Sequence, residues 1–348
     1  MSDLDSILNK LFEKEILSRQ QAYTLQKQIL SGKVNTEILL KVFEHLSGRI
    51  IDFQELSGIL TASAEAMTAV PCVLPTLDTC STGGDGLDIF NVSTLAAIVC
   101  ASLNVPVAKH GNRSASSKHG SFDLLERLQV NFQLNSQQAS QLLDKTGLVF
   151  LFAPIFHPAF GQAKEARTQF GKPTYFNFLG PLLNPTHSHY QVIGVSNAKM
   201  AVGMGRALIE SGSHRVWLVA GNDGLNEITP TGQTKVWEFV AGQDVFQEFW
   251  LNPQEYGLSL HDLEDIKCFS LDQAEEIFWQ VLENKSDQAA MDTVILNSAA
   301  GLYVYGRAAN YSDALELAKE ALCSGQALAK FMEFKKEANA YPNLYASD

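Results

Sequence analysis

The sequence predicts an α/β fold that follows an N-terminal segment made of helices only. The chain has 348 residues, of which 46% are apolar and 18% are charged. That is enough chain for a large core and roughly two domains. The first seventy residues contain helical patterns only. From about residue 72, β-rich runs alternate with amphipathic helical stretches, as expected for a sheet with helices on its faces.

The N-terminal helices are expected from their capping residues. Ser18 can cap a helix that ends at Gly32, and Asn35 can cap the next one, which ends at Gly48. Asp52, with a glutamate three residues later, matches a capping box before a third amphipathic stretch. These signals predict that helices follow one another through this segment.

Strands and helices are expected to alternate in the rest of the chain, before a hairpin and a helical end. The strands are expected at 105–108, 148–152, 191–195 and 215–220. The helices are expected at 94–103, 123–128, 136–145 and 200–210. Residues 235–250 have the pattern of a β-hairpin that turns at Ala241-Gly242, and residues 273–335 have a mostly helical pattern.

The charge balance and the cysteines limit the function classes. With 26 basic and 38 acidic residues, the formal net charge is −12, which disfavours nucleic acid or an anionic membrane as a partner. A site for a phosphorylated ligand must then be a local basic patch. The five cysteines form no Cys-x-x-Cys pair, which is typical of a cytoplasmic protein without disulfides or a zinc framework. We expect no secretory signal and no membrane helix, because the long uncharged runs contain asparagine and proline.

The first segment whose residues could bind a ligand is a glycine loop, from Ser81 to Thr94, between an expected strand and an expected helix. Its sequence is Ser-Thr-Gly-Gly-Asp-Gly-Leu-Asp-Ile-Phe-Asn-Val-Ser-Thr. Glycines let the backbone approach a ligand closely, and free N–H groups at a helix start favour a phosphate. The final Asn-x-Ser-Thr offers an amide and hydroxyls to phosphate oxygens or to a metal. Alone, the loop fits an ordinary glycine turn before a capped helix equally well.

The second segment, Lys109 to Ser121, is the basic patch that the acidic composition requires. Residues 109–119 include two lysines, one arginine, two histidines and no acid, with serines and glycines among them. A helix begins near Asp123, so that cations, hydroxyls and a helix start can converge on an anion. The alternative is a solvated surface loop, which seldom combines this charge bias with so many hydroxyls.

Three further segments have weaker signals. His157 is followed by Arg167, and an arginine can bind a carboxylate through two parallel hydrogen bonds, although a histidine alone is more typical of a structural residue. Residues 177–185 have the pattern of a rigid prolyl turn. Residues 221–227, Gly-Asn-Asp-Gly-Leu-Asn-Glu, follow an expected strand. Their carboxylates suit Mg²⁺ as well as they suit a solvated acidic turn.

Taken together, these segments resemble the anthranilate phosphoribosyltransferase family nearly end to end. The family pattern is Gly-Thr-Gly-Gly-Asp, Asn-Ile-Ser-Thr, Lys-His-Gly-Asn-Arg, His-Pro-Ala, Phe-Asn-x-Leu-Gly-Pro-Leu-x-Asn-Pro and Asp-Gly-x-Asp-Glu. This chain matches it in order and with similar spacing through Ser-Thr-Gly-Gly-Asp, Asn-Val-Ser-Thr, Lys-His-Gly-Asn-Arg, His-Pro-Ala, Phe-Asn-Phe-Leu-Gly-Pro-Leu-Leu-Asn-Pro and Asp-Gly-Leu-Asn-Glu. Asp292 to Ala300 also resembles a C-terminal segment of the family. Each motif is weak alone, but the ordered set is highly specific.

The resemblance implies an architecture and a reaction. A small all-helical domain (residues 1–70, with a return segment at about 163–190) would join a larger α/β domain (71–348) with a central, mostly parallel sheet flanked by helices. The active site would lie between the domains, and the small domain would mediate a homodimer. The substrates would be anthranilate and 5-phosphoribosyl 1-pyrophosphate (PRPP), the cofactor Mg²⁺, and the reaction the displacement of pyrophosphate from ribose C1 by the aromatic amine, in the cytoplasm.

The resemblance also implies roles for residues, position by position. The residues that would bind PRPP are Ser81, Gly84, Asp85, Ile89, Asn91, Val92, Ser93, Thr94, Lys109, His110, Gly111, Asn112, Arg113, Ser114, Ala115, Ser116, Ser117 and Ser121. Those that would form the anthranilate pocket are Ser81, His110, Asn112, His157, Arg167, Gly180 and Pro181, with Arg167 facing the carboxylate. Those that would ligate Mg²⁺ are Ser93, Asn226 and Glu227. No general base is assigned, because catalysis is expected from stabilisation of the leaving pyrophosphate and alignment of the amine.

Three departures from the pattern of the family matter. Ser81 stands at the first glycine of the glycine motif, and Pro173 stands where an arginine is usual. Asn226 stands where the family has an aspartate. Asparagine keeps an oxygen ligand but removes a negative charge, so one Mg²⁺ site should be weaker unless the neighbouring Asp223 compensates.

Two alternatives stay open from the sequence. One is a paralogue of this family with an altered acceptor or lost catalysis, suggested by Asn226 and Ser81. The other is a pyrimidine nucleoside phosphorylase, whose family shares the glycine and Lys/Ser loops. Those chains are typically longer and lack the Asn-x-Leu-Gly-Pro segment.

Overall fold

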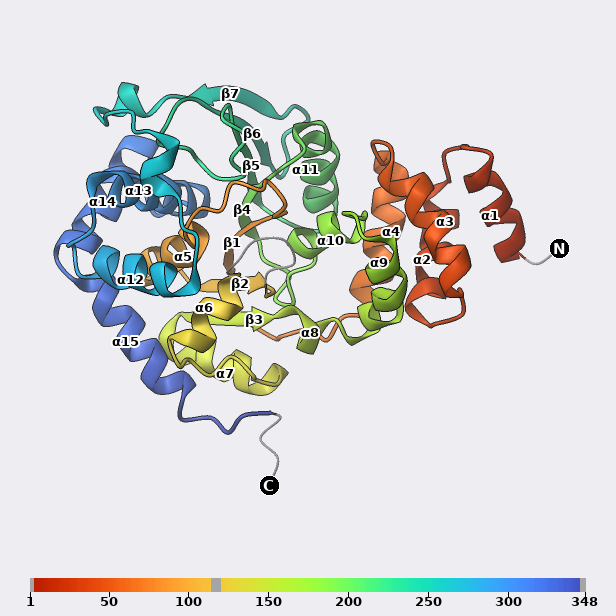
Figure 1. Cartoon of the computed structure of the whole chain (residues 1–348), viewed down its shortest axis with the longest axis horizontal. Coiled ribbons are helices and arrows are strands. Elements are labelled where there is room, and N and C mark those ends of the chain that lie inside the picture. The colour runs from red at the N-terminus through yellow and green to blue at the C-terminus, as the bar shows by residue number, and fades with distance from the viewer. Residues whose placement is uncertain (1–2, 114–119, 345–348) are drawn as a thin grey trace.

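The centre of the molecule is a mostly parallel sheet, as the sequence predicts (Figure 1). Within residues 3–113 and 120–344, which the computed structural model describes, seven strands pair in the order β3-β2-β1-β4-β5-β6-β7. The pairs from β3 to β5 are parallel, and β6 and β7 are antiparallel. The strands are β1 Leu77–Ser81, β2 Val107–Gly111, β3 Leu148–Phe152, β4 Tyr190–Gly194, β5 Arg215–Gly221, β6 Thr234–Val240 and β7 Gln247–Leu251.

The expected strands and the hairpin are confirmed, with one shift that matters for the site. The strand expected at 105–108 begins only at Val107. Val105 is not part of it, because its N–H donates to the Cys100 carbonyl oxygen (3.3 Å) at the end of the preceding helix. The strand instead continues to Gly111, so the beginning of the basic segment is strand and not loop. Lys109 and His110 are therefore held rigidly by their neighbours in the sheet.

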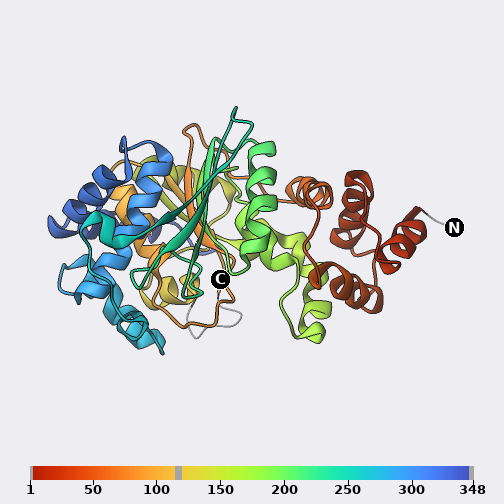
Figure 2. The ribbon, with the colours of Figure 1, turned by 90° about the horizontal axis from the view of Figure 1, so that it is seen from above.

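Helices cover both faces of the sheet (Figure 2). The N-terminal helices are α1 Asp3–Phe12, α2 Arg19–Leu30, α3 Thr36–Ser47 and α4 Phe53–Glu65, and they lie on the same side as α9 Lys164–Phe170, α10 Phe176–Leu182 and α11 Ala201–Glu210. The other side holds α5 Val92–Ser102, α6 Ser121–Arg127, α7 Ser136–Thr146, α8 Ala153–Phe156, α12 Leu271–Leu282, α13 Gln288–Tyr305, α14 Tyr311–Cys323 and α15 Gln326–Ala338. The short 3₁₀ helices of the described residues are η1 Pro158–Ala163, η2 Ala198–Met200, η3 Pro253–Tyr256 and η4 Leu263–Ile266.

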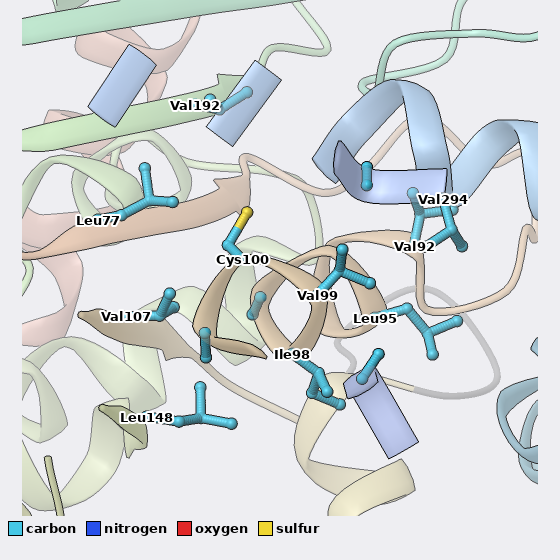
Figure 3. Close-up of a cluster of buried hydrophobic side chains, with 14 of the residues drawn as sticks. Leu77, Val92, Leu95, Ile98, Val99, Cys100, Val107, Leu148, Val192 and Val294 are labelled. Atoms are coloured by element: carbon cyan, nitrogen blue, oxygen red, sulfur yellow. The ribbon is translucent and has the colours of Figure 1, made fainter. Parts of the chain in front are cut away.

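The larger apolar cluster surrounds α5. Every residue of this helix except Ser93 is buried, because the helix packs between the sheet and α13. Figure 3 shows Leu95, Ile98 and Val99 of α5 among side chains of the sheet and Val294 of α13. A helix that is apolar on all sides is expected only where every side is covered. The single exception, Ser93, faces the site.

The second cluster joins the N-terminal helices to residues from the middle of the chain. The ring of Phe43 on α3 lies edge-on to the rings of Phe170, Tyr175 and Phe176, at centroid distances of 5.7, 6.0 and 6.0 Å. The Tyr175 hydroxyl donates to Gln26 Oε1 on α2 (2.7 Å). The N-terminal helices thus share their core with α9 and α10.

The expected helix caps are confirmed. The side chains of Ser18, Asn35 and Asp52 accept hydrogen bonds from the first turns of α2, α3 and α4. No helix in the described part of the chain combines the length and the apolar character needed to cross a bilayer.

Candidate active site

The glycine loop between β1 and α5 has open space above its backbone. Gly83, Gly84 and Gly86 have φ angles of +64°, +78° and +71°, which side-chain-bearing residues rarely adopt. A Cβ atom added at any of these glycines would meet nothing within 4 Å. The conformation of the backbone therefore requires glycine here, and the space above the loop is available to a ligand.

A buried lysine lies beside this loop. Lys109 is 2% exposed, and its Nζ donates to the Thr79 carbonyl oxygen (2.5 Å) and to Ser93 Oγ (3.0 Å). The Thr79 hydroxyl in turn donates to the Ser93 carbonyl oxygen (3.0 Å). The ammonium group is thus fixed between the end of β1 and the first turn of α5. An anion bound there would meet a positive charge and a hydroxyl together.

Glu227, in the loop after β5, brings a carboxyl group to the same region. The residue is 9% exposed, and burial raises the pKa of its carboxyl group to about 8. The Lys109 ammonium opposes this rise, and Asp85 adds to it. The carboxyl group therefore lacks enough positive charge nearby, and a bound cation would favour its ionised form.

Asn226 joins the acidic loop to the glycine loop. In the amide orientation that satisfies both neighbours, Asn226 Nδ2 donates to Asp85 Oδ2 (2.8 Å) and Asn226 Oδ1 accepts from the Gly83 N–H (3.3 Å). The Asn226 backbone N–H also donates to Asp85 Oδ2 (3.4 Å). An aspartate at this position would place two carboxylates against each other, so the asparagine suits a site without a permanently bound cation.

The suggestion that Asp223 compensates for Asn226 finds no support. The Asp223 carboxylate accepts hydrogen bonds from the hydroxyls of Thr229 (2.5 Å) and Thr231 (2.6 Å) and from the Leu225 N–H (3.0 Å). These bonds hold together the turn that follows β5. The Asp223 carboxylate therefore has its hydrogen-bond partners within its own loop.

The oxygen donors near Lys109 fit a magnesium ion. Within the described residues, no three His, Cys, Asp or Glu side chains gather into a metal cage. Instead, the Ser93 hydroxyl, the Glu227 carboxyl group and the Asp85–Asn226 pair offer hard oxygens. Mg²⁺ commonly takes one or two carboxylates from the protein and completes its coordination with water and the phosphates of a ligand. The residues therefore suit a metal that binds together with a phosphorylated ligand.

Two neutral histidines form a second group. The rings of His110 and His157 are buried, and their centroids lie 4.9 Å apart. His110 Nδ1 lies 3.0 Å from the Gly180 carbonyl oxygen and donates to it, so His110 Nε2 is an acceptor. His110 Nε2 and His157 Nε2 are buried without a hydrogen-bond partner among the residues that the structure describes. Burial lowers the pKa of His157 to about 4 and also lowers the pKa of His110, so both rings are uncharged.

Arg167 lies on α9, which follows His157 along the chain. Its side chain is half-buried, its guanidinium carbon lies 5.5 Å from the centroid of the Phe176 ring, and burial lowers its pKa. Among the described residues its guanidinium forms no hydrogen bond and no ion pair. A partly desolvated cation without a counterion favours an anionic ligand, and a guanidinium suits a carboxylate.

The other predicted site residues are spread more widely. The guanidinium of Arg113 pairs with Glu126 (2.5 Å) and Asp123 (3.2 Å) of α6. Ser114, Ala115, Ser116 and Ser117 lie outside the described residues. The remaining positions are as follows: Ser81 ends β1, Ile89 forms a bridge with Lys267, Asn91 is at the N-cap position of α5 without a capping side-chain hydrogen bond, Val92 and Thr94 lie in the first turn of α5, Gly111 ends β2, Asn112 is exposed, Ser121 begins α6 and Pro181 lies in α10.

Sequence reasoning missed three buried residues that shape the site. A Cβ atom at Gly194 would lie 1.5 Å from the Asn226 carbonyl oxygen, so only glycine lets the acidic loop pack against the end of β4. A glycine inside an expected strand was the available signal for this close approach. The other two, Asp78 and Asn184, are polar residues of β1 and of the prolyl segment, and nothing in the sequence showed that their side chains meet.

The raised pKa of Glu227 predicts that the metal-free protein loses stability between pH 7 and pH 8. At pH 7 the unfolded carboxyl group has lost its proton, whereas the folded one largely retains it. The folded state therefore binds more protons, and a rise in pH favours unfolding. We expect the free energy of unfolding, measured by urea denaturation, to fall by about 1 kcal/mol from pH 7 to pH 8. His110 and His157 add little, because unfolded histidine is already mostly neutral above pH 7.

The matched control for this effect is Glu227→Gln, which keeps the size of the side chain and cannot ionise. Its free energy of unfolding should stay nearly constant from pH 7 to pH 8. If both proteins lose the same amount, another group is responsible.

Comparisons with known proteins agree on one family. A family model described as "Glycosyl transferase family, a/b domain" matches residues 74–328. A relative named anthranilate phosphoribosyltransferase, from Geobacillus sp. (strain WCH70), is 38% identical over 336 residues, which cover 96% of this chain and 98% of the relative.

Solved structures of proteins with the same name are also similar to this chain. The crystal structure of anthranilate phosphoribosyltransferase from Thermus thermophilus has a TM-score of 0.89 and 32% identity, over 96% of this chain and 99% of that one. The Saccharomyces cerevisiae enzyme in complex with PRPP and Mg has a TM-score of 0.85 and 28% identity, over 97% of this chain and 98% of that one.

Proposed function

The chain belongs to the anthranilate phosphoribosyltransferase family, and we propose that its residues divide between a PRPP site and an acceptor site. The reaction transfers the 5-phosphoribosyl group from PRPP to the amine of anthranilate and gives N-(5-phosphoribosyl)anthranilate and pyrophosphate. It is the second step of the tryptophan branch, and its cofactor is Mg²⁺. The observation that carries the proposed division is the buried Lys109 ammonium beside the open glycine loop.

The PRPP site is proposed at the ends of β1 and β2. The glycine loop supplies backbone N–H groups to the phosphates, and Lys109 and Ser93 meet the pyrophosphate as negative charge builds on it in the transition state. Because Lys109 is already fixed by Thr79 and Ser93, little reorganisation is needed during the reaction.

The metal site is proposed at Ser93, Asn226 and Glu227. Mg²⁺ supplies neutralisation of the charge on the departing pyrophosphate. Glu227 supplies a carboxylate, and its raised pKa means that it loses its proton when the cation arrives. Asn226 can offer only its amide oxygen, which already accepts a hydrogen bond from the Gly83 N–H.

The acceptor site is proposed between the two histidines and Arg167. The guanidinium of Arg167 holds the anthranilate carboxylate, and the free acceptor His110 Nε2, together with the unpaired ring of His157, orients the amine. The neutral state of both rings keeps positive charge away from the nucleophilic nitrogen. No general base is assigned among these residues.

The assembly is proposed to follow the rest of the family. The small helical domain takes residues 1–70 and the return segment at about 163–190, supported by the shared core of α3, α9 and Tyr175. Residues 71–348 form the large domain. A homodimer through the small domain and a cytoplasmic location complete the proposal.

The proposed function is tested by the loss of anthranilate fluorescence when the protein is mixed with PRPP and millimolar Mg²⁺. We expect turnover that chelation of Mg²⁺ abolishes. Absence of turnover at every Mg²⁺ concentration would favour the paralogue with a different acceptor or lost catalysis. Phosphate-dependent cleavage of thymidine would instead favour the nucleoside phosphorylase.

Asn226→Asp is expected to keep the activity and to lower the Mg²⁺ concentration needed for half-maximal rate severalfold. The added carboxylate is a better ligand for a hard cation, and it also repels Asp85 until a cation separates them. The metal-free variant should therefore unfold at a lower temperature than the wild type and regain stability with Mg²⁺ and PRPP.

The matched control is Asn226→Ala, which loses the oxygen ligand and should need more Mg²⁺ than the wild type. An Mg²⁺ titration that is the same for all three proteins would remove position 226 from the metal site.

A further inference from the structure

β1 and β2 separate from each other at the level where the site begins. They share one register pair, Leu77 with Val107, whereas the ladders from β1 to β4 and from β2 to β3 continue through five pairs each. Above the shared pair, the backbone of β2 needs other partners for its N–H and carbonyl groups, because it is buried there. Side chains supply these partners.

Asp78 and Asn184 are the side chains that fill the gap. Asp78 Oδ1 accepts from the His110 backbone N–H (3.2 Å), and Asp78 Oδ2 accepts from Asn184 Nδ2 (2.7 Å). The same Asn184 nitrogen donates to the Ala108 carbonyl oxygen (2.7 Å). Asn184 Oδ1 accepts from the N–H and the hydroxyl of Thr186 (2.9 and 2.8 Å). Every polar atom of the two side chains therefore has a partner.

The carboxylate of Asp78 is fully buried and joins both walls of the acceptor site. One partner is the backbone of His110, whose ring donates to the Gly180 carbonyl oxygen. The other partner, Asn184, lies four residues after Gly180 in the segment that carries this carbonyl. The contacts thus form a closed path from Asp78 through His110 and Gly180 to Asn184 and back. Burial raises the pKa of Asp78 to about 6, while Lys109 and the hydrogen bonds oppose the rise.

We propose that Asp78 is a positioning residue for the acceptor, which fixes the His110 ring and the Gly180 carbonyl against each other through the His110 N–H and Asn184. This inference rests on the proposed function, since it takes His110 and Gly180 as walls of the anthranilate site. Asp78 itself lies behind these walls, and its effect on the reaction passes through them.

The test is Asp78→Asn, which keeps the shape of the side chain and replaces one acceptor with a donor. The new amide must then face either the His110 N–H or the Asn184 amide, both of which are donors. We expect the KM for anthranilate to rise by roughly tenfold or more, while the KM for PRPP changes by less than about threefold. Equal rises in both KM values, or no change in either, in a folded variant would overturn the proposal.

The matched control is Thr76→Val, which removes a buried hydroxyl just before β1. Thr76 bonds to the hydroxyls of Thr186 and Ser188 and not to His110 or Asn184. Its loss should lower the stability, measured by thermal unfolding. It should not raise the KM for anthranilate more than the KM for PRPP. If Thr76→Val raises the KM for anthranilate over that for PRPP as strongly as Asp78→Asn does, any destabilisation of this region has the same effect and the proposal fails.

Two further variants test the role of Asp78. In the double variant Asp78→Asn with Asn184→Asp, the amide at 78 can donate to the carboxylate at 184 and still accept from His110, so part of the anthranilate KM should recover. If Asp78→Asn does not fold, Asn184→Ala should show the same selective rise.

The wild-type turnover tests the proposed function separately from Asp78. If there is no turnover, the imidazole N–H signal of His110 in an NMR spectrum still decides the question. Asp78→Asn should shift this signal and Thr76→Val should not, and an unmoved signal would overturn the proposal.

Discussion

Replacement of Lys109 by methionine should lower kcat/KM for PRPP by about 10²- to 10³-fold, the loss typical of a preorganised charge that stabilises a leaving group. Methionine keeps the apolar length of the side chain and removes the ammonium that contacts Thr79 and Ser93. Because this group is fixed in a buried position, neither solvent nor a flexible side chain can replace it. The measurement is steady-state kinetics with PRPP varied at saturating anthranilate and Mg²⁺.

The control for Lys109→Met is Lys145→Met. Lys145 is exposed and pairs with Glu337 at the surface, so its loss should leave the kinetics unchanged. A fall of less than about tenfold in kcat/KM for Lys109→Met, with the fold intact by circular dichroism, would place the pyrophosphate elsewhere.

Arg167→Ala should raise the KM for anthranilate by roughly 10- to 100-fold, as expected for the loss of charge-assisted hydrogen bonds to a carboxylate. The guanidinium is half-buried, lies against the Phe176 ring and has no counterion among the described residues, so it is poised for an anionic group. PRPP does not approach this side of the site in the proposed arrangement, and its KM should change little.

Arg167→Lys separates charge from geometry in the same experiment. It keeps the positive charge but loses the planar fork, so its anthranilate KM should lie between those of the wild type and Arg167→Ala. Equal effects of Arg167→Ala on both substrates would refute the assignment of Arg167 to the acceptor.

The elements of the fold were predictable because their signals are local. Caps such as Ser18 and Asn35 and the alternation of strands with helices depend on residues close in sequence, and the structure confirms them. The start of β2 was misplaced because it depends on a long-range choice, namely whether Val105 bonds to a strand or to the end of α5. Such competition between partners leaves no mark in the residue pattern.

The site was predictable where the chemistry is concentrated in one segment. The glycine loop and the basic segment stood out, and the structure brings Lys109 and Ser93 of these segments into direct contact. Arg113 was grouped with Lys109 by sequence proximity, but the acids that neutralise it lie on α6, further along the chain. Asp78 and Asn184 are far apart in sequence, and only the folded chain shows that they meet.

The shared core of the N-terminal helices has a consequence for protein synthesis. Phe43 is buried by Phe170, Tyr175 and Phe176, which the ribosome adds more than a hundred residues later. Until then, the helices of a nascent chain expose an apolar surface that local contacts cannot cover. We therefore expect the emerging N-terminal region to stay sensitive to proteases and to recruit chaperones until translation has passed α10, whereas a chain that starts with a complete local core would be protected early.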